Sequence, residues 1–168
     1  MKQRYGLPDA KIARIFNPID LEKWRPFRRS DARAAARRHP RRRMPWADRH
    51  EVTDRTVVQR ILSAADAYVM ASRRERFPVA PVEAMALGLP VVATDASGVP
   101  DIFEGGELHG GLVVPRDDAE ALATALGRVL DDPALRRRLG ERARARVEEG
   151  FSPAAIGRQL RDFVLGGR

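Results

Sequence analysis

The sequence contains no cysteine, which excludes disulfide bonds, thiolate metal sites and cysteine nucleophiles. Its three histidines, His39, His50 and His109, are scattered and do not have metal-ligand spacing. No apolar run approaches the roughly 20 residues that a membrane-spanning helix needs, and the first residues lack the apolar core of a signal peptide. These absences favour a soluble, cytoplasmic protein that binds no metal.

Positive charge is concentrated in the first third of the chain. Residues 1–60 contain 17 Lys and Arg against 7 Asp and Glu, whereas residues 61–168 contain 14 against 16. Because 28 of the 31 basic residues are Arg, the Arg-favouring codons of a GC-rich genome are the simpler explanation. The alternative is a patch for nucleic acid or an anionic membrane. Few aromatic residues are interspersed with the arginines, so nucleic acid is the least favoured partner.

Residues 1–50 are predicted to form a basic leading segment, degenerate or partly disordered, rather than a domain. A short strand is expected near residues 13–16. Residues 30–38 have the composition of a short basic helix with Ser30 as its N-cap. Residues 39–50 have no apolar period and are expected to form a loop or to be disordered.

Residues 51–168 alternate between strand and helix patterns and are long enough to form one domain with a buried core. Strands that alternate with helices predict a parallel sheet covered by helices, so the expected fold class is α/β with a partial Rossmann-like sheet. The expected strands are 67–71, 90–94 and 112–114, and the expected helices are 54–65, 78–87, 117–130, 133–148 and 153–164.

Several local signals refine these expectations. Gly88 lies where a helix C′ glycine belongs, residues 117–120 resemble a capping box, and Ser152 is expected to cap the last helix. The arginines of helix 133–148 are expected to face solvent. An apolar side is expected on the last helix, formed by Ile156, Leu160, Phe163 and Val164.

The most informative segment contains two carboxylates separated by seven residues. Glu75 is placed on the loop after strand 67–71, and Glu83 is placed one or two turns into the following helix. Open α/β sheets bind ligands in the crevice outside the carboxyl ends of their strands, so both carboxylates are expected to face one crevice. The loop between them precedes a helix N-terminus, where backbone N–H groups and the helix dipole favour an anion.

This segment resembles the retaining GT-B glycosyltransferases of family 4. That family carries Glu-x7-Glu followed by Glu-Ala-Met-Ala-x-Gly-x-Pro-Val-Val, and the run is complete here from Glu83 to Val92. The resemblance extends through residues 94–102, 110–115 and 117–130, and upstream through residues 17–26. It implies the C-terminal half of a GT-B fold. The implied function is transfer of a hexosyl group from a nucleotide-diphosphate sugar to an unknown acceptor, with retention at the anomeric carbon.

The resemblance assigns a role to each carboxylate. Glu75 would contact the donor sugar and stabilise the positive charge that develops at its anomeric carbon in an oxocarbenium-like transition state. Glu83 would accept hydrogen bonds from the ribose hydroxyls of the nucleotide. The alternatives are an exposed loop carboxylate at Glu75 and an ordinary helix-surface glutamate at Glu83.

The resemblance also implies that the loop into the helix meets the donor sugar and diphosphate. Phe77, Pro78, Val79 and Ala80 would act through their backbone, while the side chains of Phe77 and Val79 are expected in the core. Arg76 replaces a small residue, often glycine, so it either reaches the diphosphate as a cation or crowds the site. No metal or cofactor is expected, because this family stabilises the leaving diphosphate with basic residues and the helix end.

The chain departs from the family in what it lacks. The family has an N-terminal acceptor domain, and the first half of its C-terminal domain supplies three strands and the Gly-Arg and Lys residues that neutralise the diphosphate. Neither is recognisable here, and residues 26–51 leave no room for three strands. We therefore expect a truncated and internally deleted chain, arising from a deletion, a frameshift or a degenerate gene copy, that is inactive alone.

Two other functions are compatible with the sequence. The chain could be a non-catalytic nucleotide-binding or interaction module that needs a partner chain, and a sheet edge left by missing strands would favour association. More remotely, it could be a basic nucleic-acid-binding protein. The expected location is the cytoplasm, with peripheral attachment to the inner membrane face as an alternative.

Overall fold

Three parallel strands form the single sheet of the described structure. The computed structural model describes residues 18–38 and 54–166. The strands pair in chain order, β1-β2-β3, and they are β1 (Tyr68–Met70), β2 (Val91–Thr94) and β3 (Gly111–Val114). All three lie within the expected strands or within one residue of them, and the expected α/β class is confirmed.

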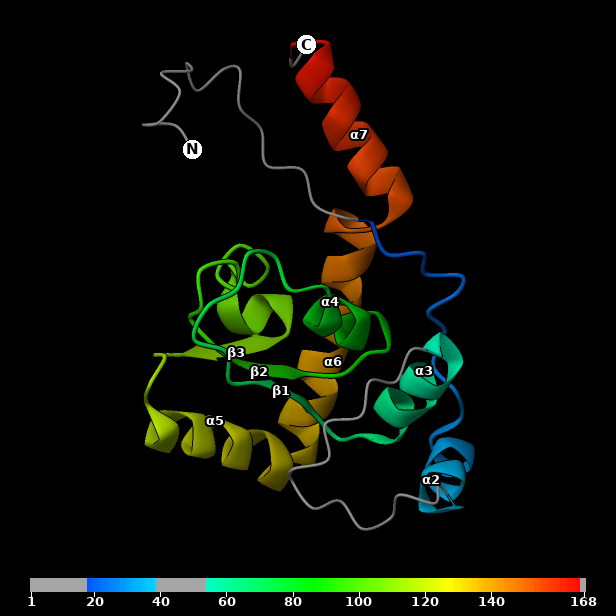
Figure 1. Ribbon diagram of the computed structural model, residues 1–168, viewed down its shortest axis with the longest axis vertical. Coiled ribbons are helices and arrows are strands. Elements are labelled where there is room, and N and C mark those ends of the chain that lie inside the picture. Colours follow the sequence, from blue (N-terminus) through cyan, green and yellow to red (C-terminus); the bar gives the residue numbers. More distant parts are fainter. Residues whose placement is uncertain (1–17, 39–53, 167–168) are drawn as a thin grey trace.

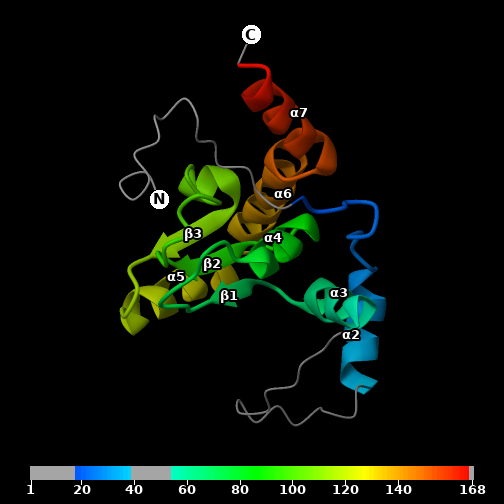
Figure 2. The same cartoon turned by 45° about the horizontal axis from the view of Figure 1, so that its top comes forward.

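Helices cover both faces of this sheet. Figures 1 and 2 show α4 (Val79–Ala86) on one face and α5 (Ala119–Asp131) on the other. The side chains of β2 alternate between two cores, because Val91 and Ala93 pack on the α4 side and Val92 packs on the α5 side. A strand buried on both faces needs an unbroken apolar run, which explains why this segment contains no polar residue before Thr94.

Helix α6 (Pro133–Gly150) closes the amino end of the sheet. A β-carbon on Gly140 would lie 2.3 Å from the carbonyl oxygen of Gly88, which precedes β2. Gly110, just before β3, has a φ of 78°, and a β-carbon there would lie 2.3 Å from the backbone nitrogen of Ala143. The two halves of α6 contribute to the two cores. The segments that lead into β2 and β3 are therefore packed against α6.

Three further helices complete the described chain, together with the short 3-10 helix η2 (Gly106–His109). In Figures 1 and 2, α2 and α3 lie side by side near the start of β1, and α7 leads away from the body beyond α6. Their bounds are α2 (Arg29–Arg38), α3 (Arg55–Ala64) and α7 (Pro153–Val164). The apolar side of α7 is largely uncovered, with Leu160 50% and Val164 70% exposed.

The expected basic helix is confirmed as α2, but its predicted cap is wrong. The helix begins at Arg29, and the carbonyl oxygen of Arg28 accepts the first backbone hydrogen bonds, from Asp31 and Ala32. Ser30 therefore lies inside the first turn, where its hydroxyl donates to Asp31. The expectations for residues 13–16 and 39–50 fall outside the described residues.

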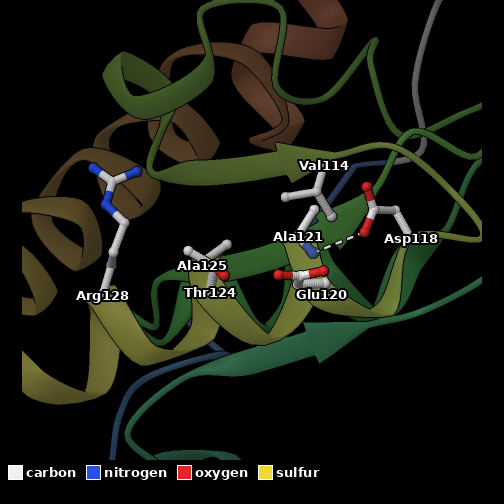
Figure 3. A pocket seen from close by; sticks show the side chains of 7 residues that line it. All are labelled: Val114, Asp118, Glu120, Ala121, Thr124, Ala125 and Arg128. Carbon is white, nitrogen blue, oxygen red and sulfur yellow. Dashed lines mark hydrogen bonds between the residues drawn. The ribbon is translucent and has the colours of Figure 1, made fainter.

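The helix starts in the second half of the chain are defined by side-chain caps. Asp118 accepts a hydrogen bond from the backbone nitrogen of Ala121 at 2.8 Å and so begins α5 (Figure 3). The expected capping box is thus a single aspartate cap, and Glu120 is an exposed residue of the first turn. Ser152 caps α7 as predicted, and Gly88 ends α4 with a φ of 76°.

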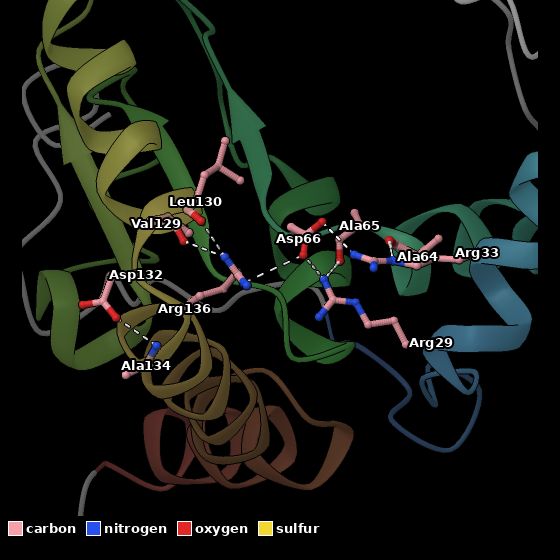
Figure 4. A network of polar contacts seen from close by, with 10 residues as sticks. All are labelled: Arg29, Arg33, Ala64, Ala65, Asp66, Val129, Leu130, Asp132, Ala134 and Arg136. Atoms are coloured by element: carbon pink, nitrogen blue, oxygen red, sulfur yellow. Dashed lines mark hydrogen bonds and ion pairs between the residues drawn. The ribbon is translucent and has the colours of Figure 1, made fainter.

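The expectation that the α6 arginines face solvent is wrong for four of them. Arg136 donates to the carbonyl oxygens of Val129 and Leu130 at the end of α5 (Figure 4). Arg144 reaches the carbonyl oxygens of Trp24 and Ala86. Arg142 and Arg146 likewise donate to backbone carbonyl groups. Helix ends leave carbonyl groups without partners inside the helix, and arginines satisfy them while complementing the helix dipole.

One carboxylate joins helices from both ends of the chain. Asp66, between α3 and β1, pairs with Arg29 and Arg33 of α2 and, at 3.8 Å, with Arg136 of α6 (Figure 4). Arg29 and Arg33 also donate to the carbonyl oxygens of Ala65 and Ala64 at the end of α3. These arginines of the basic segment therefore hold α2 against the domain.

No helix among the described residues combines the length and apolar character required to cross a bilayer.

Candidate functional site

Glu75 lies on the loop between β1 and α4, at the carboxyl end of the sheet. The hydroxyl of Ser72 donates to Glu75 Oε1 at 2.7 Å. The carbonyl oxygen of Ser72 in turn accepts a hydrogen bond from the buried hydroxyl of Thr94, the last residue of β2. The orientation of Glu75 is thereby set by the neighbouring strand.

A second loop supports the backbone just beyond Glu75. Gly98, in the turn after β2, lies so close that a β-carbon there would stand 2.0 Å from the carbonyl oxygen of Arg76 and 3.1 Å from the nitrogen of Phe77. Only glycine permits this approach. The role of Gly98 is therefore to let the two backbone segments approach each other.

Glu83 lies in the second turn of α4 and is partly buried. Burial raises the pKa of its carboxyl group, and the positive charge of Arg55 opposes that rise. Among residues 18–38 and 54–166, the Glu83 side chain makes no hydrogen bond or ion pair with another residue. An ionised carboxylate only accepts hydrogen bonds, so this position suits a ligand that donates them.

Tyr68 connects the two carboxylates. It packs against the core on the α4 side of the sheet, and its phenol has a raised pKa, first because of burial and then because of the charges of Glu75 and Glu83. The charges of both carboxylates thus reach the same phenol, while the shared crevice stays a prediction. Sequence reasoning did not single out Tyr68 or Ser72. The spacing of Ser72 three residues before Glu75 was the available signal.

The loop residues differ in how far they are buried. Pro78 is buried, and Phe77 packs partly buried with its ring centroid 6.1 Å from that of Phe151, as expected. Val79 is 37% exposed, so its predicted core position is wrong, and Ala80 and Arg76 are exposed. Pro78 is the N-cap of α4 and provides no side-chain cap. The first N–H groups of α4 therefore suit an anionic ligand.

Two ion pairs connect the loops that follow the three strands. Asp95, after β2, pairs with Arg116, after β3, at 3.2 Å. Arg73, after β1, pairs with Asp117, after β3, at 2.6 Å. The carboxyl end of the sheet is therefore a connected set of loops, and Glu75 lies within it.

Glu75 and Glu83 are both partly exposed, so the site faces solvent. Three of the hollows on the described part of the chain are lined by neither Glu75 nor Glu83. The largest, of about 710 Å³, lies between α6 and Asp66 near the amino end of the sheet. The others lie beside α5. One has a volume of about 600 Å³, and the other, shown in Figure 3, about 360 Å³. A ligand bound at Glu75 and Glu83 would therefore remain exposed to solvent on one side.

The family of the chain follows from comparison with known proteins. The family described as glycosyl transferases group 1 matches residues 48–146, which include both carboxylates, the intervening loop and all three strands. The match covers more than half of the 168 residues. The chain belongs to this family.

Curated relatives are similar over the same region. The chain is 40% identical over 115 residues to a putative colanic acid biosynthesis glycosyltransferase of Salmonella typhimurium, covering 64% of this chain and 28% of the relative. It is 37% identical over 99 residues to an MMP α-(1→4)-mannosyltransferase of Mycolicibacterium hassiacum, covering 59% and 24%. The chain thus matches about a quarter of the length of these relatives.

Solved structures share the fold. A sucrose-phosphate synthase from Thermosynechococcus elongatus matches with a TM-score of 0.57 and 38% identity, covering 64% of this chain and 27% of that one. The Anabaena protein HepE, solved in complex with UDP-glucose, matches with a TM-score of 0.56 and 25% identity, covering 65% and 30%.

Proposed function

We propose that this chain binds the nucleotide-diphosphate sugar donor of a hexosyl transfer reaction that retains the anomeric configuration. One observation carries the proposal: Glu75 lies on the loop at the carboxyl end of a parallel sheet and Glu83 in the helix that follows, within the region that defines the glycosyltransferase family. The UDP-glucose complex of a structural neighbour supports this class of ligand. The acceptor, whether a sugar, a lipid-linked glycan or a small molecule, is a separate question.

Glu75 acts on the sugar. As the bond between the anomeric carbon and the diphosphate oxygen lengthens, positive charge develops on the sugar ring, and a carboxylate held beside it lowers the energy of that state. The hydrogen bond from Ser72 fixes one oxygen of Glu75 and leaves the second for the ligand. An oriented carboxylate loses little freedom when the transition state forms.

Glu83 acts on the nucleoside. Its two carboxylate oxygens can each accept a hydrogen bond from one of the vicinal ribose hydroxyls. Because Glu83 is partly buried, those hydrogen bonds would be shielded from water and would count for more than exposed ones.

The diphosphate would lie at the N-terminus of α4. The uncapped N–H groups of Val79 and Ala80 supply donors there, and the exposed Arg76 supplies a positive charge. Of the two alternatives for Arg76, we propose the cation, and its exposure supports that choice. Stabilisation by these groups requires no divalent ion.

Transfer to an acceptor requires a second surface. The described face is open, and an open face neither excludes water nor positions an acceptor hydroxyl. We therefore propose that a partner chain or a further domain covers it, and that this chain alone binds donor with little or no turnover.

Thermal melting of the purified chain with and without millimolar UDP, GDP and ADP tests the proposal. One nucleotide should raise the melting temperature, because a ligand that binds only the folded state stabilises it. The rise should vanish in Glu83→Ala and persist in Glu120→Ala, a control on the exposed side of α5. A melt insensitive to every nucleotide would contradict donor binding.

A non-catalytic interaction module is the second candidate, and the edge of the sheet favours it. The nitrogen of Tyr68 donates to Pro90 on the β2 side, so the backbone groups of Val69 point to the other side. No described strand pairs with that side, and the Val69 side chain is 40% exposed. Copurification of a stoichiometric partner that is lost on Val69→Pro would favour this candidate.

A further inference from the structure

The loop that carries Glu75 is connected to the far side of the sheet by a side-chain contact. Arg73 Nε lies 2.6 Å from Asp117 Oδ1. Arg73 follows β1 and Asp117 follows β3, and β2 lies between those strands. The pair therefore spans the carboxyl end of the whole sheet and does not join neighbouring strands.

The Asp117 end of this contact is firmly anchored. Just before it, the backbone nitrogen of Arg116 donates to Asp95 at 2.8 Å, and the Arg116 side chain pairs with the same carboxylate. Just after it, Asp118 caps α5 (Figure 3). Asp117 is thus held on both sides by the scaffold.

The backbone of Asp117 is unusual for its residue type. Its φ of 62° is the only positive φ of a non-glycine residue in the described ranges. Glycine adopts this left-handed conformation without strain, and asparagine tolerates it. Aspartate combines that conformation with the negative charge that pairs with Arg73.

The loop from β1 to α4 is also attached elsewhere. The Ser72 carbonyl is held by Thr94, the backbone of Arg76 and Phe77 rests on Gly98, and the Phe77 ring packs against Phe151. Arg73 and its ion pair add an attachment next to Ser72, which orients Glu75. Loss of one attachment would let the loop, and with it Glu75, sample more positions.

We propose that Arg73 and Asp117 form a strut that positions Glu75 for the donor sugar, which makes both of them positioning residues. This inference rests on the proposed donor-binding function. The strut acts on the loop, whereas Glu83 is carried by α4. Its loss should therefore weaken contacts to the sugar and diphosphate while leaving contacts to the ribose intact.

Calorimetric binding of two probes separates these contributions. The probes are a nucleoside diphosphate hexose, UDP-glucose or GDP-mannose, and the nucleoside monophosphate of the same base. Asp117→Asn and Arg73→Gln should lower the affinity for the nucleotide sugar about two- to fivefold, the range expected for an exposed ion pair. The affinity for the monophosphate should stay unchanged. Arg73→Lys, which keeps the charge, should recover most of the affinity.

Asp117→Gly distinguishes positioning from general stability. It relieves the strain of the left-handed backbone and should not lower the melting temperature. It should nevertheless weaken binding of the nucleotide sugar as much as Asp117→Asn does. Equal weakening of both probes, or no change in either, would overturn the strut.

Hydrogen exchange of the amides in residues 71–78 provides a ligand-free measurement. Exchange should accelerate in Asp117→Asn and not in the control Glu120→Gln. If the unaltered chain bound none of the nucleotides, the donor-binding function would fail. In that case, unchanged exchange in Asp117→Asn would also reject the strut. Faster exchange would show that the ion pair still restrains the loop.

Discussion

Glu83 is expected to lower the stability of the chain in the ionised form that the proposed ligand binding requires. Burial raises the pKa of its carboxyl group above the ordinary value of 4.5. A raised pKa in the folded state means that folding favours the protonated form. Glu83 therefore lowers stability as the pH rises through the interval between the ordinary pKa and the raised one. A neutral residue of the same shape would remove that cost and also one of the acceptor oxygens that we propose for the ribose.

The first prediction is that Glu83→Gln raises the melting temperature at pH 7 and has little effect near pH 4. Over the same interval, nucleotide affinity of the unaltered chain should increase with pH, because only the ionised carboxylate accepts two hydrogen bonds. Melting curves and calorimetry across pH 4–8 measure both trends. If stability and affinity changed in the same direction, the role of Glu83 would be refuted.

Gly98 gives the second prediction at this scale. A β-carbon there would collide with the Arg76 carbonyl oxygen, so Gly98→Ala should destabilise the chain by roughly 1–3 kcal/mol and displace the loop. Gly157 lies within α7 with open space around it, and Gly157→Ala should stabilise the chain by about 0.5–1 kcal/mol. Urea unfolding of both variants tests the contrast. Equal changes in the unfolding free energy of the two variants would show that the close contact at Gly98 does not affect stability.

At the scale of the elements, one carboxylate contributes to the attachment of α2. Asp66 accepts from Arg29 and Arg33, which are 46% and 47% exposed, so the pairs are only partly shielded from water. Packing of α2 on α3 adds to this attachment.

The third prediction concerns that attachment. Asp66→Asn should lower the unfolding free energy by about 1 kcal/mol at low salt and by less at high salt, since partly exposed ion pairs are weak and screened. Limited proteolysis should cut within α2 sooner. Asp162→Asn, which breaks a pair between adjacent residues of α7, is the control and should leave α2 protected. Equal protection of α2 in both variants would show that packing alone holds it.

The sequence predicted the elements well because their signals are local. The apolar run at Val91 and the cap at Ser152 each depend on a few neighbouring residues. The Asp66 contacts and the arginine contacts of α6 join residues far apart in the chain, and no local pattern encodes them. For the same reason Glu75 and Glu83 were predictable as a pair, while the support from Thr94 and Gly98 was not.

At the scale of the whole molecule, the positive charge is less available than the composition implies. Arg29, Arg33 and Arg136 surround Asp66, and Arg144 pairs with Glu148 at 2.7 Å. Arginines that cap helix ends compensate the negative ends of helix dipoles. These contacts oppose the nucleic-acid alternative within the described part of the chain.

The fourth prediction follows from that distribution. Filter binding of a single-stranded and a double-stranded oligonucleotide at 50 and 200 mM salt should give weak retention. A functional phosphate-binding surface would instead give strong retention at low salt that falls steeply with salt concentration. Tight binding at 200 mM salt would restore the nucleic-acid alternative.

The two ends of the sheet differ in how well they tolerate substitutions. At the amino end, Gly88 and Gly110 are in contact with α6, so a larger residue there would disrupt packing. At the carboxyl end, the loops face outward and contact each other through exposed charged side chains. The sequence of these loops can therefore change without rebuilding the core. A chimera that carries the corresponding three loops of a relative should still fold on this scaffold, and under the proposed function it would take the donor preference of that relative.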